Sequence, residues 1–282
     1  MVAVQWYPGH MEKSRRQMEE SLKAVDCVIE VRDCRIPLAS RNPLLEEMAA
    51  RKPRLIVLTR LDLADPQKTA LWLDALAKDG TECLALDLAK DASAGKKVVS
   101  RCLALCQPKI EKMKSRGIKP RAMRAMAAGI PNVGKSTLIN RIAVRKAAEA
   151  ANRPGVTRTL KWIPADPQLQ LLDTPGVLWP KFEDPRVGSL LAATGAISDE
   201  VLDRGMIAMD AVRIIQQLYP GLLEKEYDAA AGTNPHQMLK AVASKRMLLK
   251  EGGELDLRRA ADVFLHELRR GSLGRLTLED PQ

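Results

Sequence analysis

The sequence predicts an α/β domain with a mainly parallel sheet, followed by a small all-helical domain. Up to about residue 182, short apolar runs alternate with helical patterns, which is typical of an α/β domain. A glycine-rich loop follows one of these runs and precedes a helical pattern, as in proteins that bind phosphates. After residue 183, apolar residues recur at helical spacing. We therefore expect two domains, at 1–182 and 183–282.

Five short apolar runs of the first domain have the length and the polar boundaries of buried strands. They span residues 27–31, 55–58, 83–86, 125–128 and 169–172. Helical patterns lie around them, at residues 11–23, 43–51, 66–78 and 95–113. Ligands of parallel sheets bind at loops that follow the carboxyl ends of the strands, so functional residues are expected in those loops.

The second domain contains four helical patterns, at residues 187–197, 201–218, 238–249 and 257–268. Turns rich in glycine and proline separate the last three, at 219–221, 232–235 and 252–253.

The composition is that of a globular protein, with 46% hydrophobic and 28% charged residues. No apolar run approaches the roughly 20 residues that cross a bilayer, and no signal peptide is recognisable, so we expect no membrane partner. The five cysteines are scattered and form no CxxC pair. This pattern argues against a zinc site or a disulfide framework and favours a reducing cytoplasm.

The formal net charge of +10 is concentrated in two stretches. Residues 107–126 hold 7 Lys/Arg against 1 Asp/Glu, and residues 137–162 hold 6 against 1. Residues 183–282 hold 13 against 16, so the helical domain does not share this excess. Such clustering favours an anionic partner, nucleic acid above all, although a solvated basic helix face would look the same.

Residues 129–136 read GIPNVGKS, a full match to the phosphate loop GxxxxGK[ST]. Backbone N–H groups of such a loop surround the phosphates, and the following helix adds a favourable dipole. Lys135 is expected to reach the terminal phosphates, and the Ser136 hydroxyl to bind Mg²⁺. The nucleotide contacts are therefore expected at Asn132, Val133, Gly134, Lys135, Ser136 and Thr137.

Two further segments fit this site. Asp173-Thr174-Pro175-Gly176 follows an apolar run, which suits Asp173 to hold Mg²⁺ and the Gly176 N–H to sense a γ-phosphate. Residues 153–159 read RPGVTRT and would form a first switch, with Thr157 closing on Mg²⁺; an ordinary surface loop is the alternative.

With these motifs the chain resembles the circularly permuted GTPases, and one branch closely: the bacterial ribosome biogenesis GTPase A family. The resemblance covers essentially the whole chain. Besides the nucleotide motifs, it rests on QWYPGHM at 5–11, RDCRIP at 32–37, SRNP at 40–43, KPR at 119–121 and TGAI at 194–197.

The permuted order places the base-recognition loop, Thr59-Arg60-Leu61-Asp62, before the phosphate loop. The family's Asn-Lys-x-Asp is altered here. Asp62 can accept two hydrogen bonds from guanine, Arg60 can lay its stem and guanidinium plane over the base, and Thr59, shorter than Asn, is expected to lose a contact. The next base-contacting loop aligns with Asp87-Leu88.

The residues after the DxxG glycine, Val177 and Leu178, offer no side-chain hydrogen bond to the attacking water. The resemblance implies two substitutes: a potassium ion on Asn132, and the side chain of His10. A structural or RNA-contacting role for His10 is the alternative.

The resemblance implies a GTPase that assembles the large (50S) ribosomal subunit, binding rRNA in the GTP state and leaving after hydrolysis, with the helical domain in contact with RNA. GTP or GDP, Mg²⁺ and K⁺ are the implied cofactors; no DNA partner is expected, and the chain is expected to be a monomer. A switch acting on a protein partner and an ATP-using enzyme are the competing interpretations.

Overall fold

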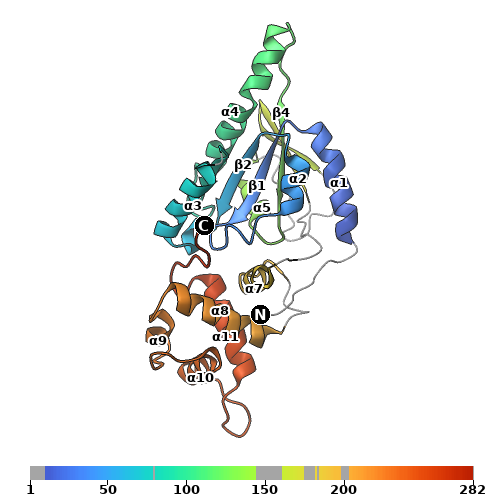
Figure 1. Cartoon of the computed structure of the whole chain (residues 1–282). Helices are drawn as coiled ribbons and strands as arrows, with labels where there is room; N and C mark the ends of the chain where they lie inside the picture. The colour runs from blue at the N-terminus through green and yellow to red at the C-terminus, as the bar shows by residue number, and fades with distance from the viewer. Residues whose placement is uncertain are drawn as a thin grey trace. The chain divides into compact units, whose positions relative to one another are not determined.

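A computed structural model describes residues 10–78, 80–143, 161–174, 182, 184–197 and 203–281, without the side chains of residues 10–15, 17 and 161. The chain forms two compact units (Figure 1). The described part of the first runs to Thr174, and that of the second from Phe182 to Glu279. Asp280 and Pro281 belong to the first unit. The predicted boundary at 182/183 adjoins residues outside the described part and stays a prediction.

The first unit is built on one six-stranded sheet, with the spatial order β3-β2-β1-β4-β6-β5. All neighbouring strands are parallel except β5 and β6, which confirms the mainly parallel sheet. The strands are β1 (Cys27–Asp33), β2 (Arg54–Thr59), β3 (Glu82–Ala85), β4 (Met123–Gly129), β5 (Lys161–Asp166) and β6 (Leu169–Asp173).

Helices cover both faces of this sheet, which makes a three-layer α/β unit (Figure 1). Buried side chains of α1 and α2 pack with β1, β4 and β6 on one face, and α3 packs over β2 and β3 on the same face. α4 and α5 contact each other and the opposite face. The helices are α1 (His10–Ala24), α2 (Pro43–Ala49), α3 (Pro66–Lys78), α4 (Ala94–Ser115) and α5 (Lys135–Ile142).

The parallel strands β1, β2, β4 and β6 have their carboxyl ends at one edge of the sheet. The phosphate loop follows β4, the predicted base loop follows β2, and Asp173 ends β6. The sheet thus brings together motifs that are far apart and permuted along the chain.

The second unit is helical, as predicted, and α7, α8, α10 and α11 begin at polar caps. Asp184, Asp203, Asn234 and Asp256 each accept a hydrogen bond from a backbone N–H of the following first turn. The helices are α7 (Pro185–Ala193), α8 (Arg204–Leu218), α9 (Leu222–Glu226), α10 (Pro235–Lys245) and α11 (Leu257–Arg270). Within the described ranges no helix has the length and apolarity that a membrane span requires.

Candidate nucleotide-binding site

The phosphate loop has the backbone geometry that its sequence requires. Gly134 adopts φ 94° as the N-cap of α5, and Asn132 is left-handed at φ 55°. A Cβ at Gly134 would also lie 3.3 Å from the Thr59 hydroxyl. In a phosphate loop, such turns allow successive N–H groups and the N-terminus of the following helix to converge on one point, where a phosphate group can bind.

Lys135 and Asp173 meet at this point. The Lys135 ammonium donates to the Asp173 carboxylate over 2.6 Å, and both side chains are mostly buried. The Thr174 hydroxyl donates to the Ala127 carbonyl over 2.8 Å, which fixes the chain directly after Asp173 to β4. Ser136, on the first turn of α5, is exposed. A carboxylate and a hydroxyl beside a phosphate loop are the ligands that Mg²⁺ takes in such sites.

The base loop is tied directly to the phosphate loop. The Thr59 hydroxyl lies 2.6 Å from the Val133 carbonyl and 3.1 Å from the Arg32 carbonyl, and its single proton favours the nearer one. The Arg60 guanidinium donates to the Asn132 carbonyl over 2.8 Å. Thr59 therefore keeps a bond to the phosphate loop despite its short side chain. Arg60 directs its guanidinium to that loop as well.

The remaining base-contact candidates are placed as follows. Asp62 lies in a short 3₁₀ turn after β2 and is exposed. The Asp87 carboxylate accepts bonds from the backbone N–H groups of Ala89 and Lys90, at 2.9 and 3.0 Å. Leu88 is buried in the core, so only its backbone is available to a base. Their contacts with guanine stay predictions.

A buried polar cluster at the end of β1 was not assigned a role from the sequence. The Asp33 carboxylate accepts three hydrogen bonds from Arg35, at 2.8 to 3.0 Å, and lies 3.4 Å from the Arg60 Nε. Burial alone would raise the pKa of Asp33, but the two arginines lower it below its ordinary value. The RDCRIP motif marked this segment through resemblance alone.

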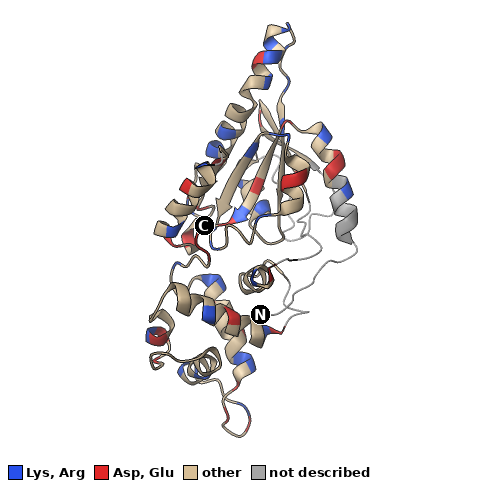
Figure 2. Ribbon diagram, in the orientation of Figure 1, with Lys and Arg blue, Asp and Glu red and all other residues tan. Residues whose placement is uncertain are grey.

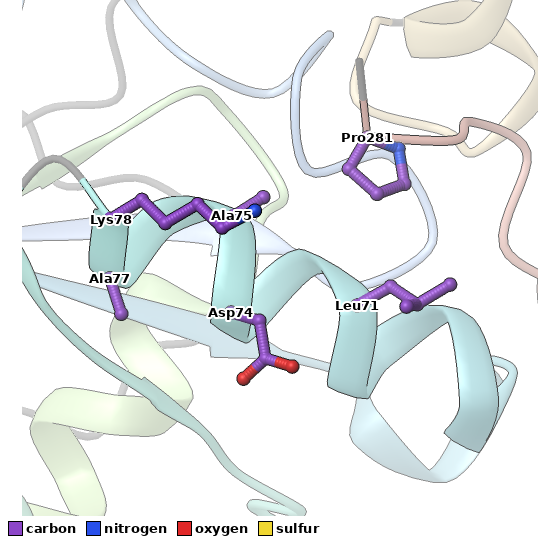
Figure 3. A pocket seen from close by; sticks show the side chains of 6 residues that line it. All are labelled: Leu71, Asp74, Ala75, Ala77, Lys78 and Pro281. Atoms are coloured by element: carbon purple, nitrogen blue, oxygen red, sulfur yellow. The ribbon is translucent and has the colours of Figure 1, made fainter.

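Several predicted residues lie outside the described part: Thr157, Gly176, Val177, Leu178 and the side chain of His10. Their roles stay predictions. A separate hollow lies on the outer side of α3 (Figure 3). It is lined by Leu71, Asp74, Ala75, Ala77, Lys78 and Pro281 and contains no residue of the nucleotide motifs.

Fold and site together define a P-loop GTPase in which the predicted base loop precedes the phosphate loop. The family described as "50S ribosome-binding GTPase" matches residues 124–239. Full-length similarity is more specific, and by it the chain belongs to the ribosome biogenesis GTPase A family. The chain is thus a GTP-hydrolysing enzyme, as the motifs predicted.

Two relatives and one solved structure give the measure of this similarity. "Ribosome biogenesis GTPase A" of Priestia megaterium is 45% identical over 99% of this chain and 98% of its own length. The protein of the same name from Bacillus cereus is 42% identical over 100% and 95%. GNP-bound YlqF from Thermotoga maritima has a TM-score of 0.68 at 26% identity, covering 96% of this chain and 99% of that one.

Proposed function

We propose that this GTPase assists assembly of the large ribosomal subunit, binding rRNA in the GTP state and leaving after hydrolysis. The observation that carries the proposal is the convergence of the phosphate loop, the base loop and Asp173 at one sheet edge in a chain whose relatives are named for ribosome biogenesis. A switch of this kind exchanges partners when the nucleotide changes.

Guanine selection is assigned to Asp62, whose carboxylate accepts bonds from the guanine ring N–H and amino group. Adenine lacks this pair of donors. The Arg60 stem would lie along the base, and Asp87-Leu88 would border it. Phosphate contacts are assigned to the loop backbone from Asn132 to Thr137 and to the Gly176 N–H.

Ser136, Thr157 and Asp173 are the residues that would hold Mg²⁺, and Asn132 would hold K⁺. When bound there, these cations would neutralise charge that develops on the terminal phosphates during hydrolysis. Lys135 supplies a further positive charge at the same place. Its bond to Asp173 supports the assignment of both side chains to one site.

Water positioning is the step that the chain is least equipped to perform alone, because Val177 and Leu178 carry no polar side-chain group. We assign it to His10, brought to the γ-phosphate when the ribosomal partner orders the switch segments. The isolated protein should then hydrolyse GTP slowly.

The RNA-binding surface is assigned first to the free end of α4. Figure 2 shows Lys and Arg gathered on the last turns of this helix. Lys112, Lys114, Arg116 and Lys119 are exposed, and among the described residues no acidic side chain pairs with them. Lys109 and Arg121, by contrast, pair with Asp26. Four exposed cations at one end suit a phosphate backbone. A further RNA contact is assigned to the helical domain.

The proposal is tested by measuring phosphate release with purified large subunits, with small subunits, and with neither. Large subunits should accelerate hydrolysis well beyond the other two conditions, and potassium should exceed sodium. Lys135→Ala should abolish hydrolysis in every condition. His10→Ala should bind subunits and GTP normally but lose most of the stimulated rate.

Three results would contradict parts of this proposal. Equal stimulation by both subunits would remove the large subunit as the partner. If ATP and GTP competed equally well against labelled GDP, the proposed selectivity for guanine would be wrong. If large subunits stimulated GTP hydrolysis by His10→Ala as fully as by the parent, His10 would have a structural or RNA-contacting role instead.

A further inference from the structure

The end of β1 and the base loop are neighbours by register, since Asp33 pairs with Thr59 across the parallel strands. Asp33 is 4% exposed, and its carboxylate is held from one side by Arg35. The backbone N–H of Asp33 donates to the Ser40 hydroxyl over 3.0 Å. Asp33 is therefore fixed by the segment that connects β1 to α2, independently of any nucleotide contact.

Arg60 bridges this fixed carboxylate and the phosphate loop. Its Nε lies 3.4 Å from one Asp33 oxygen, and another guanidinium nitrogen donates to the Asn132 carbonyl over 2.8 Å. The backbone of Arg60 is left-handed at φ 58°, a conformation that costs a non-glycine residue about 1 kcal/mol. The surroundings must hold such a residue in place.

We propose that Asp33 is a positioning residue for guanine recognition, holding Arg60 so that its stem and the adjacent Asp62 meet the base. The proposal rests on the assignment of residues 59–62 as the base loop. Arg35 contributes indirectly, because its bonds to both oxygens set the orientation of the Asp33 carboxylate.

A carboxylate suits this role better than a neutral amide. Arg60 can be attracted by charge at 3.4 Å even without an ideal hydrogen bond, whereas an amide of the same shape offers only a weak dipole. The plain alternative is that Asp33 only stabilises its own turn through Arg35. In that case its removal would change folding stability and leave base recognition intact.

A double-mutant cycle between Asp33→Asn and Arg60→Met separates these roles, with displacement of fluorescent GDP as the measurement. Asp33→Asn should weaken GDP binding about tenfold, and by less than about twofold when Arg60 is already Met. Mg²⁺–tripolyphosphate, which has no base, should compete against fluorescent GDP with an inhibition constant that Asp33→Asn leaves within about twofold. Thermal unfolding reports the structural contribution separately.

An equal loss of GDP affinity in both backgrounds, or an equal loss for GDP and tripolyphosphate, would overturn the proposal. If Asp33→Asn does not fold because Arg35 is left as a buried charge, Asp33→Asn/Arg35→Gln removes both charges and enters the same cycle. The assignment of residues 59–62 as the base loop is tested separately. If it is wrong, Asp62→Asn will cause no gain of xanthosine nucleotide binding.

Discussion

At the residue scale, the predicted base loop is bonded to the phosphate loop although its sequence departs from the family's Asn-Lys-x-Asp. The Thr59 hydroxyl and the Arg60 guanidinium bond to two consecutive carbonyls, those of Val133 and Asn132. The predicted base loop and the phosphate loop are thereby fixed to each other. A displacement of either loop would disturb both parts of nucleotide recognition.

The first prediction is that Asp62→Asn shifts preference from guanosine to xanthosine nucleotides. An amide can donate a hydrogen bond where the carboxylate only accepts one, and xanthine offers the matching acceptor. Competition of GDP and XDP against fluorescent GDP measures the shift. Asp65→Asn, an exchange of the same kind just beyond the 3₁₀ turn, is the control and should leave the preference unchanged.

The second prediction is that Met247→Gly stabilises the protein. Met247 follows α10 at φ 52°, its side chain is 83% exposed, and the N–H of Leu248 bonds back to Ala243 over 2.8 Å. Glycine is the residue that this helix ending favours, so the gain should be about 1 kcal/mol.

Thermal or denaturant unfolding of the second unit measures this gain. Met247→Ala removes the same exposed atoms but keeps a Cβ, so it should give no comparable gain. Equal stability of the two variants would mean that the left-handed backbone at this position is not strained.

The contacts of single residues were predictable where a sequence motif specifies their chemistry, and less predictable where they depend on tertiary packing. Lys135 and Asp173 were predicted to share a site, and they lie in contact. For Thr59 the sequence indicated a lost contact, since side-chain length says nothing about how closely the phosphate loop approaches β2. The link between Asp33 and Arg60 was not predicted, because it depends on how β1, which ends at Asp33, pairs with β2, which Arg60 follows.

At the scale of elements, the parallel strands were predicted to within one or two residues, because each is a short, mostly apolar run with polar boundaries. β5 was not predicted: it is an edge strand with alternating exposure and a proline, and its apolar pattern is correspondingly weak. In the second unit, α7 ends four residues before the predicted range 187–197 does, and α8 begins three residues after the start of the predicted range 201–218. Their bounds follow polar caps and the left-handed Gly195 instead of apolar spacing.

The third prediction concerns the junction of α4 and α5. A Cβ on Gly95 would lie 2.2 Å from the Arg141 carbonyl oxygen at the end of α5. Alanine normally stabilises a helix by up to about 1 kcal/mol relative to glycine, so the sign of the effect is diagnostic here. Gly95→Ala should destabilise the first unit by about 2 kcal/mol.

Denaturant unfolding of the first unit is the measurement, with Lys96→Ala as the control on an exposed neighbour in the same turn. The control should change stability by less than about 0.5 kcal/mol. A stabilised Gly95→Ala protein would mean that α4 and α5 do not approach so closely.

At the scale of the whole molecule, Asp26 connects three parts of the first unit near the edge of the sheet where β1 and β4 begin. Its carboxylate accepts bonds from Lys109 of α4, from Arg121 in the loop before β4, and from the Arg124 N–H. Burial alone would raise the pKa of Asp26, but these bonds lower it to about 2. This edge is therefore stabilised by a charge that acid removes.

The fourth prediction follows from this pKa. A carboxylate with a lowered folded-state pKa stabilises above its unfolded value of 3.8, and the contribution is lost as pH falls towards 2. Asp26→Asn should therefore cost about 2 kcal/mol at neutral pH and flatten the stability curve between about pH 4 and pH 2. Unfolding followed across pH measures both effects. A stability curve of Asp26→Asn with the same slope as the parent would contradict this role of Asp26.

The fifth prediction concerns the exposed cations at the end of α4. Charge reversal at Lys112, Lys114 and Arg116 should weaken binding to large subunits and reduce its salt dependence, with nucleotide affinity unchanged. Reversal at Arg51, Lys78 and Lys96, also exposed, gives the same change in net charge at other places. Co-sedimentation at several salt concentrations compares the two. Equal weakening would indicate a general effect of net charge.

The strand order also has a consequence for the newly made chain. β1, β2 and β3 leave the ribosomal exit tunnel first, yet β1 is completed on its other side only by β4. At usual rates of translation, the residues between β1 and β4 take roughly 5 to 20 seconds to synthesise. During that interval the nascent protein presents an open strand edge in a crowded cell, a condition under which chains pair wrongly or recruit chaperones. The permuted order of a GTPase thus determines which strands are synthesised before their partners in the sheet.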